Sequence, residues 1–299
     1  MDTSDDGGAR QATFPWAPIL QAVGAVMLFS VSDAMAKVLR VSLPAAEVAW
    51  LRYMTFAAFA AVLAARNDLP ALRSRRPGLQ VLRGVTLVGS AAFFIAGLGR
   101  LPLAEAAAIS FISPAFITAL SIPFLGEVVG IRRWAAVLAG LLGVLIVIRP
   151  GGGALQAAAL FPLASAACWA VTIIITRRMG TLDRSETTLL WSAWTGLLLL
   201  TALVPFGFIV PSAGQVALGV GIGLAASTGQ YVLILAYRRA AASLLAPFSY
   251  VQLLSSTLLG ALVFGAVPDG MTLLGASVII ASGLYTIHRE RVRARERRD

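Results

Sequence analysis

The chain has 299 residues, of which 58% are hydrophobic and only 13% are charged, and its mean hydropathy is +0.83. Soluble domains carry about 25% charged residues, so this composition excludes a water-soluble globule and predicts an integral membrane protein. The single cysteine, Cys168, and the single histidine, His288, exclude an intrachain disulfide, a cysteine-based metal cluster and a Ser-His-Asp triad. We therefore expect no catalytic residues, no metal and no cofactor.

Ten apolar segments each approach the roughly 20 residues that cross a bilayer as a helix. They cover residues 15–37, 44–65, 80–99, 103–125, 131–149, 156–176, 186–209, 213–236, 242–266 and 270–288. The residues before them, 1–14, are acidic and rich in glycine, and they lack the basic start and the cleavage site of a signal peptide. We expect these residues to form a retained, disordered cytoplasmic leader, and residues 289–299 to form a basic cytoplasmic tail.

The formal net charge of +10 is unevenly distributed between the two sides of the membrane. With the first residues in the cytoplasm, most of the 24 Lys and Arg residues fall on the cytoplasmic side, including those of the final RERVRARERRD. Positive residues mark the cytoplasmic side. We therefore expect a multi-pass protein of the cell inner membrane with both termini in the cytoplasm. This distribution argues against a nucleic-acid partner. The expected partners are the lipid bilayer and a small-molecule substrate, and a monomer is compatible with the sequence.

The second half of the chain repeats the first at an offset of 139 residues. Residues 100–149 align without a gap on residues 239–288, and the matches include Arg100 with Arg239, Ser110 with Ser249, and Gly126 with Gly265. Each unit, residues 15–149 and 150–288, contains five predicted spans. Because five is odd, the second unit enters the membrane from the other side. The sequence therefore predicts two inverted five-helix repeats with a substrate site between them, near the midplane.

A family resemblance follows from the segment LRGVTLVGSAAFFIAGLGRLPLAEAAAISFISPAFITALSIPFLGEVV, residues 82–129. It resembles the EamA repeat of the drug/metabolite transporter superfamily in its Arg-Gly opening at 83–84, in the Leu-Pro-Leu-Ala entry at 101–104, in Pro114 and in the final Gly-Glu pair. The second unit departs from this pattern, with Ala266 in place of the glutamate and Leu253 in place of the proline. The resemblance implies transport by alternating access of amino acids, nucleotide sugars, sugar phosphates, amines or drugs.

Ionisable residues inside predicted spans are candidates for function because they are costly in a membrane. Asp33 and Lys37 share a face of the first span, and Arg52 lies in the second, at a depth where its side chain can reach Asp33. We predict an Asp33–Arg52 ion pair, which either neutralises two charges or serves as a gate with Lys37. Glu105 opens the fourth span, either as a helix cap or as a coupling acid.

Polar and aromatic side chains inside the spans are the candidate substrate contacts. Pro114 bends the fourth span, and the serines beside it have polar counterparts in the ninth span. These positions line a cavity or join helices. The candidate substrate-binding residues are Ser110, Ser113, Trp169, Trp191, Ser227, Gln230, Tyr231, Ser249, Tyr250 and Gln252.

The predicted function is a secondary transporter. A cavity of serines, glutamines and aromatic rings suits a small amphipathic solute, and the resemblance to amino-acid exporters favours export of neutral or aromatic amino acids. A nucleotide-sugar, drug or amine transporter of the same superfamily is an alternative. An intramembrane enzyme or a channel is an alternative of a different class.

Overall fold

A computed structural model describes residues 16–66, 73–126, 131–148, 154–179, 182–239, 248 and 250–296. Every regular element in these residues is helical, and none of these residues lies in a strand. The prediction of an all-α protein is therefore confirmed for the part of the chain described. The predicted leader and one candidate residue, Ser249, lie outside the described residues.

The helices follow the predicted spans. They are α1 Trp16–Leu39, α2 Ala45–Arg66, α3 Pro77–Leu98, α4 Leu103–Ser110, α5 Ser113–Leu125, α6 Ile131–Ile148, α7 Ala154–Met179, α8 Ser185–Leu203 with a following 3-10 turn Val204–Gly207, α9 Ala213–Arg239, α11 Val251–Phe264 and α12 Gly270–Glu296. Seven helical stretches of the described chain are long and apolar enough to cross a bilayer, with α4 and α5 counted together. The apolar parts of α6, α11 and α12 are shorter, so the count of ten spans stays a prediction.

The fourth predicted span is broken in its middle. α4 ends at Ser110 and α5 begins at Ser113, and a two-residue turn separates them. Pro114 lies in the first turn of α5, where its missing N–H costs least, whereas it would interrupt the hydrogen bonds of a continuous helix. The sequence predicted a bend at this proline, and the correction is that two short helices replace one bent helix.

Two glycines end the short helices α5 and α11. Gly126 and Gly265 both have a left-handed backbone, with φ of 68° and 63°. Their N–H groups donate to Ile122 O and Ala261 O, which satisfies carbonyls at the helix ends. A side chain would strain this backbone conformation. The two glycines are equivalent at the offset of 139 residues that the sequence indicated.

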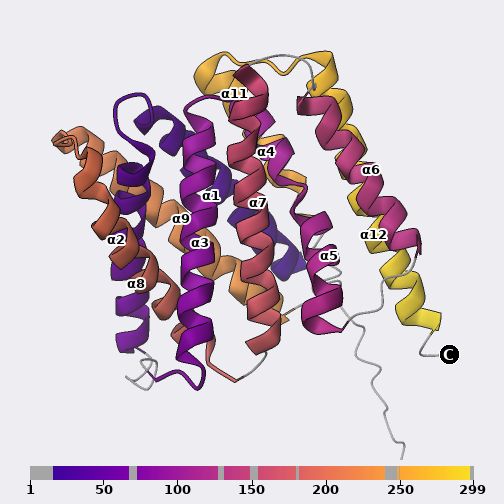
Figure 1. The fold of residues 1–299 in the computed structure, drawn as a ribbon, viewed down its shortest axis with the longest axis horizontal. Coiled ribbons are helices and arrows are strands. Elements are labelled where there is room, and N and C mark those ends of the chain that lie inside the picture. The colour runs from indigo at the N-terminus through magenta and orange to yellow at the C-terminus, as the bar shows by residue number, and fades with distance from the viewer. Residues whose placement is uncertain are drawn as a thin grey trace, which may run out of the picture.

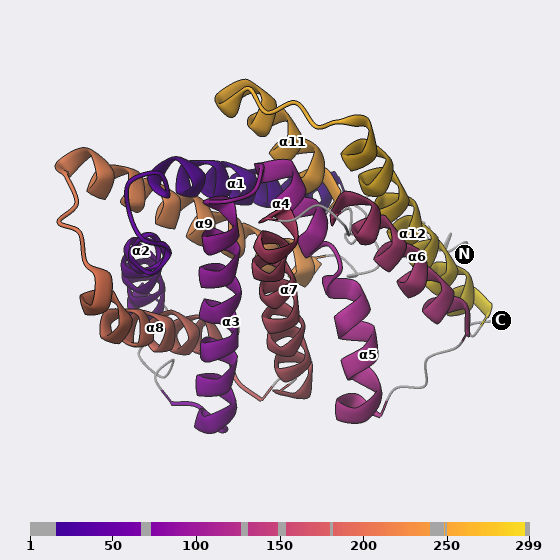
Figure 2. The same ribbon diagram turned by 45° about the horizontal axis from the view of Figure 1, so that its top comes forward.

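Antiparallel helix pairs join the first part of the chain to the second. α3 packs against α7, with Arg83 bonded to Thr176 toward one end and Arg100 over the Phe161 ring at the other. α1 packs against α9 in the same antiparallel sense. The C-terminal ends of α1 and α3 lie close to each other, as the hydrogen bond from Lys37 Nζ to the carbonyl of Leu98 shows. At one edge of the bundle, α6 and α12 lie side by side (Figures 1 and 2).

Several of the helix contacts recur between the counterparts of the same helices 139 residues later. The contact of α1 with α9 has a counterpart in that of α7 with α3, and the contact of α2 with α9 in that of α8 with α3. Likewise, α1 packs on α11 as α7 packs on α5. The offset places α2 on α8 and α6 on α12, and in each of these two pairs the helix packs against its own counterpart. Helices with the same position in the two predicted units thus occupy matching environments.

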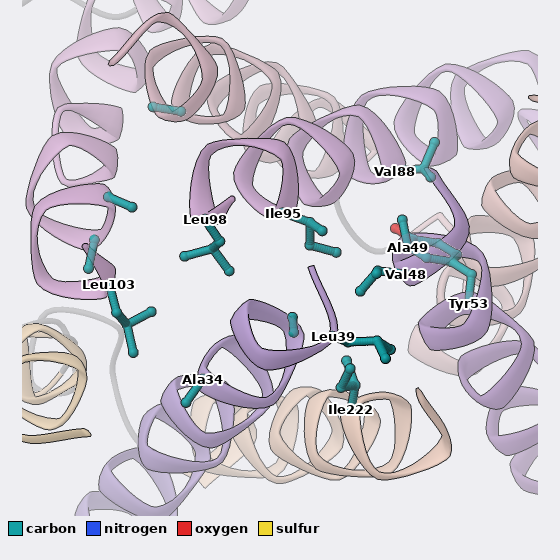
Figure 3. Close-up of a cluster of buried hydrophobic side chains, with 14 of the residues drawn as sticks. Ala34, Leu39, Val48, Ala49, Tyr53, Val88, Ile95, Leu98, Leu103 and Ile222 are labelled. Carbon is teal, nitrogen blue, oxygen red and sulfur yellow. The ribbon is translucent and has the colours of Figure 1, made fainter. Parts of the chain in front are cut away.

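Buried leucines gather where α1 and α3 end and α4 begins. Leu39, Leu98, Leu101 and Leu103 expose 2% of their surface or less, and we call these four residues the apolar plug. Figure 3 shows three of them among buried side chains of α2 and α3, with Ile222 of α9 close to Leu39. The charge distribution predicts that this end faces away from the cytoplasm.

Candidate functional site

An ion pair links α1 to α2. Arg52 Nη1 lies 3.7 Å from Asp33 Oδ1, and the two side chains expose 20% and 8% of their surface. The side chain of Gln252, at the start of α11, hydrogen bonds to the Asp33 carboxylate. The predicted Asp33–Arg52 pair is therefore present, and a residue of the predicted substrate-binding set joins it. Such pairing offsets part of the cost of placing charges inside a membrane.

Serine hydroxyls lie one helical turn from this ion pair. Ser30 Oγ lies 2.6 Å from Ser255 Oγ and accepts a hydrogen bond from Ser256 Oγ over 3.3 Å. Ser30 Oγ is also 3.2 Å from Gln252 O. Hydroxyls, an amide and a carboxylate from α1, α2 and α11 are thus linked to one another, with Ser30 and Ser256 fully buried. We call this group the polar cluster: Ser30, Asp33, Arg52, Gln252, Ser255 and Ser256.

Two aromatic rings stack beside the helix breaks. The ring centroids of Phe111 and Tyr250 are 5.2 Å apart, with an interplanar angle of 24°. Phe111 follows α4, and Tyr250 directly precedes α11. The two residues are equivalent at the offset of 139, so the stack joins matching points of the two predicted units. A flat aromatic solute can stack on either ring in the same way.

Lys37 and Glu105 lie at the plug end instead of in the polar cluster. Lys37 Nζ donates to Leu98 O and Leu101 O over 2.8 and 2.6 Å and lies 5.6 Å from the ring of Phe264. A cation at this place satisfies carbonyls that the end of α3 leaves open. Glu105 lies in the first turn of α4 and interacts electrostatically with Lys37. Both side chains therefore lie beside the apolar plug, and their predicted roles, a gate for Lys37 and a coupling acid for Glu105, stay predictions.

The remaining candidates on α4, α5 and α9 have different surroundings. Ser110 Oγ donates to Ala106 O over 2.9 Å within its own helix, which is a local role. Ser113 is the half-buried first residue of α5. Ser227 is fully buried, and its hydroxyl has no hydrogen-bond partner in the described part of the chain. One turn further, Tyr231 packs edge-to-face on Phe59 of α2, with ring centroids 6.1 Å apart.

Three further candidates are half-buried side chains of the central helices. Trp169 lies on α7, Trp191 on α8 and Gln230 on α9. Their place in a substrate site stays a prediction.

The sequence reasoning missed a second polar network, between α3, α7 and α8. Arg83 Nε donates to Thr176 Oγ1 over 2.7 Å, and its Nη1 donates to Ser192 Oγ. Thr86 and Thr172 lie 2.7 Å apart one turn along. Threonines and serines in apolar helices are weak signals singly, but their recurrence every three or four residues on α7 was a usable sign of a buried face.

A carboxylate outside the spans ties two loops together. Asp183 accepts hydrogen bonds from Ser74 Oγ at 2.5 Å, from Arg75 N at 2.9 Å and from Gln80 Nε2 at 2.7 Å. Burial by itself would raise the pKa of Asp183, but these three hydrogen bonds outweigh it and hold the pKa below its ordinary value. The contacts fix the α7–α8 loop against the start of α3, at the end opposite the apolar plug.

Comparison with known proteins identifies the family. The model of the EamA-like transporter family matches residues 16–149. A riboflavin transporter of Rhizobium johnstonii is 34% identical over 263 residues, which are 86% of either chain. The chain belongs to the EamA-like transporter family. It is therefore a multi-pass membrane transporter of small molecules and not an enzyme.

Other similar proteins have different transport names. An S-adenosylmethionine uptake transporter of Rickettsia prowazekii is 26% identical and covers 88% of this chain and 89% of its own. The pseudopaline exporter CntI of Pseudomonas aeruginosa is also 26% identical and covers 88% and 93%. A solved crystal structure shares the fold of this EamA-like transporter, with a TM-score of 0.64 at 19% identity over 91% of this chain and 96% of the other.

Proposed function

We propose that this transporter carries riboflavin, or a closely similar metabolite with a flat heteroaromatic ring and a hydroxylated tail. The observation that carries the proposal is the stack of Phe111 on Tyr250 close to the polar cluster, in a chain that is 34% identical to a riboflavin transporter. Aromatic rings stack on a flat ring system, and serine hydroxyls and an amide hydrogen bond to hydroxyl groups. The site combines both kinds of contact.

Alternating access between two inverted units is the proposed mechanism. The antiparallel α1–α9 and α3–α7 pairs and the matching helix contacts support it. So do the equivalent left-handed glycines and the equivalent stacked rings. In this proposal, the buried leucines of the apolar plug close the transport path at one end. The path then opens at the other end, where Asp183 links the α7–α8 loop to the start of α3. We place that end, and both termini, in the cytoplasm, and we place the protein in the inner membrane, as its bacterial relatives suggest.

Export of neutral or aromatic amino acids is the second candidate. An aromatic side chain can stack on Tyr250, and Arg52 can pair with a carboxylate. However, Arg52 is already paired with Asp33, so an amino acid must displace that partner. The names of similar proteins include both uptake and export, and export stays a prediction for this chain.

Uptake by a riboflavin-auxotrophic bacterium tests the proposal. Expression of the chain should restore growth on a limiting riboflavin supply, and excess riboflavin should compete with uptake of the labelled compound more strongly than phenylalanine does. Tyr250→Phe should keep most of this uptake, and Tyr250→Ala should lose at least about tenfold, because the ring contact is removed. Tyr285→Ala is the matched control, since Tyr285 is 46% exposed on α12. Growth and uptake equal to those of the empty vector would overturn the proposal.

A further inference from the structure

Asp33 is placed differently from the acidic residues of α2, α4 and α8. Glu47, Glu105 and Glu186 each lie in the first turn of their helix, where the helix dipole stabilises a negative charge. Asp33 lies on α1, more than one turn from either end of that helix. The helix ends therefore give Asp33 no such stabilisation, and an ionisable group inside a membrane helix is a candidate for function.

The contacts of Asp33 involve both predicted units. Arg52 of α2, in the first unit, lies 3.7 Å from the carboxylate, which is within reach of charge attraction but longer than a hydrogen bond. Gln252 of α11, in the second unit, hydrogen bonds to the same carboxylate through its side chain. A change in the charge of Asp33 therefore acts on contacts with both units.

Gln252 can bond to Asp33 in either protonation state. Its amide NH2 donates to an ionised carboxylate, and its amide oxygen accepts from the O–H of a protonated carboxyl group. Arg52 has donors only, so the ionised form of Asp33 alone attracts it. Protonation of Asp33 would thus keep the contact with α11 and release Arg52. Arg52 is the more exposed member of the pair, at 20% against 8%, so a solute can reach its released donors.

The other ionisable side chains on the helices around Asp33 can each be placed. On α2, Glu47 and Arg66 lie near the two helix ends, and the ring of Tyr53 packs edge-to-face on Phe56. α9 and α11 both pack on α1. α11 carries no ionisable side chain, and those of α9 are Tyr231 and, in its last turn, Tyr237, Arg238 and Arg239.

The charged groups of α1, α3 and α4 have partners of their own. Lys37 donates to two backbone carbonyls at and after the end of α3 and interacts electrostatically with Glu105 of α4. Arg83 of α3 donates to hydroxyl groups of α7 and α8. In the described part of the chain, Arg52 is therefore the charged group that faces Asp33.

We propose that Asp33 binds the proton that couples transport to a proton gradient, and that proton and substrate cross the membrane together. A proton taken up on one side forms the O–H of the Asp33 carboxyl group, and Arg52 then turns its donors to the substrate. On the other side the substrate leaves, the proton dissociates, and the carboxylate attracts Arg52 again. This inference rests on the proposed function and adds the coupling ion and the residue that binds it.

Uptake by proteoliposomes under a pH gradient tests the coupling. With the membrane potential held at zero and the outside about one pH unit more acidic, labelled riboflavin should accumulate inside. For one proton per substrate, the accumulation should reach at most about tenfold. An ionophore that exchanges protons for potassium should abolish it. Counterflow, measured on the same preparation without a gradient, reports transport that needs no coupling.

Variants of single acidic residues test where the proton binds. Asp33→Asn is neutral, as protonated Asp33 is, so it should keep counterflow and lose the accumulation under the pH gradient. Asp33→Glu keeps a carboxyl group and should keep the accumulation. Glu105→Gln is the matched control for the alternative coupling acid, and it should keep both activities. Thermal unfolding in detergent identifies a misfolded variant. Asp33→Ser, which is neutral and can bond to Gln252, then takes the place of Asp33→Asn.

The outcomes separate the function from the coupling. Wild-type protein without counterflow removes the proposed function and the coupling together. Counterflow without accumulation under the gradient, or accumulation toward the acidic side, leaves the function standing and removes the proposed coupling. Accumulation that Asp33→Asn keeps, or that Glu105→Gln loses while its counterflow remains, removes Asp33 as the residue that binds the proton.

Discussion

The Asp33–Arg52 pair couples two charges that are little exposed inside an apolar bundle. Removing one member of a buried pair leaves an uncompensated charge, whereas removing both leaves neutral groups. The Gln252 side chain would still be available to Asp33 in either case. The energetic role of the pair is therefore separable from a role in binding or gating.

Arg52→Gln should lower the stability of the protein by about 3 kcal/mol, and the double variant Asp33→Asn with Arg52→Gln should recover most of that loss. Thermal unfolding in detergent measures both. Losses that simply add in the double variant would show that the two side chains are not coupled. Riboflavin uptake by the double variant then reports any role of the charges beyond stability.

Part of the candidate site could be predicted from the sequence, and part could not. The ion pair was predictable because α1 and α2 are consecutive and the depth of each residue follows from the helix rise. The contact of Ser30 with Ser255 was not, since the two residues are 225 positions apart and only the tertiary packing brings α1 to α11. Lys37 was placed beside the ion pair by its helix face, but its contacts with the carbonyls of Leu98 and Leu101 depend on tertiary packing. Its role as a gate stays a prediction.

At the scale of elements, glycine decides how closely the helices approach. A Cβ on Gly84 of α3 would lie 2.6 Å from Thr195 Cβ of α8. A Cβ on Gly223 of α9 would overlap Thr55 and lie 2.8 Å from Arg52 O, both on α2. The two glycines are equivalent at the repeat offset, and small residues at such crossings allow close packing of membrane helices.

Gly84→Ala and Gly223→Ala should each destabilise the protein, by about 1–3 kcal/mol, because each added methyl group overpacks a helix crossing. Gly24→Ala is the control, since no atom lies within 4 Å of the added Cβ, and it should leave stability unchanged or raise it by up to about 1 kcal/mol. Thermal unfolding in one detergent compares the three. Equal melting temperatures for all three variants would contradict the packing described here.

Most elements were predictable because long apolar segments leave little choice inside a bilayer. The exceptions are places where local chemistry interrupts a span. The turn before Pro114 divides α4 from α5, and the 3-10 turn around Pro205 ends α8 at Leu203, short of the predicted residue 209. Hydropathy carries no information on such breaks, whereas proline does.

At the scale of the whole molecule, the proposed inversion of the second unit would place equivalent loops on opposite sides of the membrane. Arg73 precedes α3 and Ser212 precedes α9, and the two are exposed and equivalent at the repeat offset. In a Cys168→Ala background, Arg73→Cys should react with a membrane-impermeant maleimide only from the cytoplasmic side. Ser212→Cys should react only from the outside. Labelling of both from one side would contradict the inversion of the second unit.

We propose that one chain binds a flat, hydroxylated metabolite between two inverted units and carries it across the membrane. Counterflow with purified protein tests this most directly, because it requires binding and exchange on both faces without any other protein. Proteoliposomes preloaded with riboflavin should accumulate external labelled riboflavin transiently, with saturation, whereas preloading with phenylalanine should give far less. Accumulation no greater than in protein-free liposomes, or driven by phenylalanine and not by riboflavin, would contradict the account.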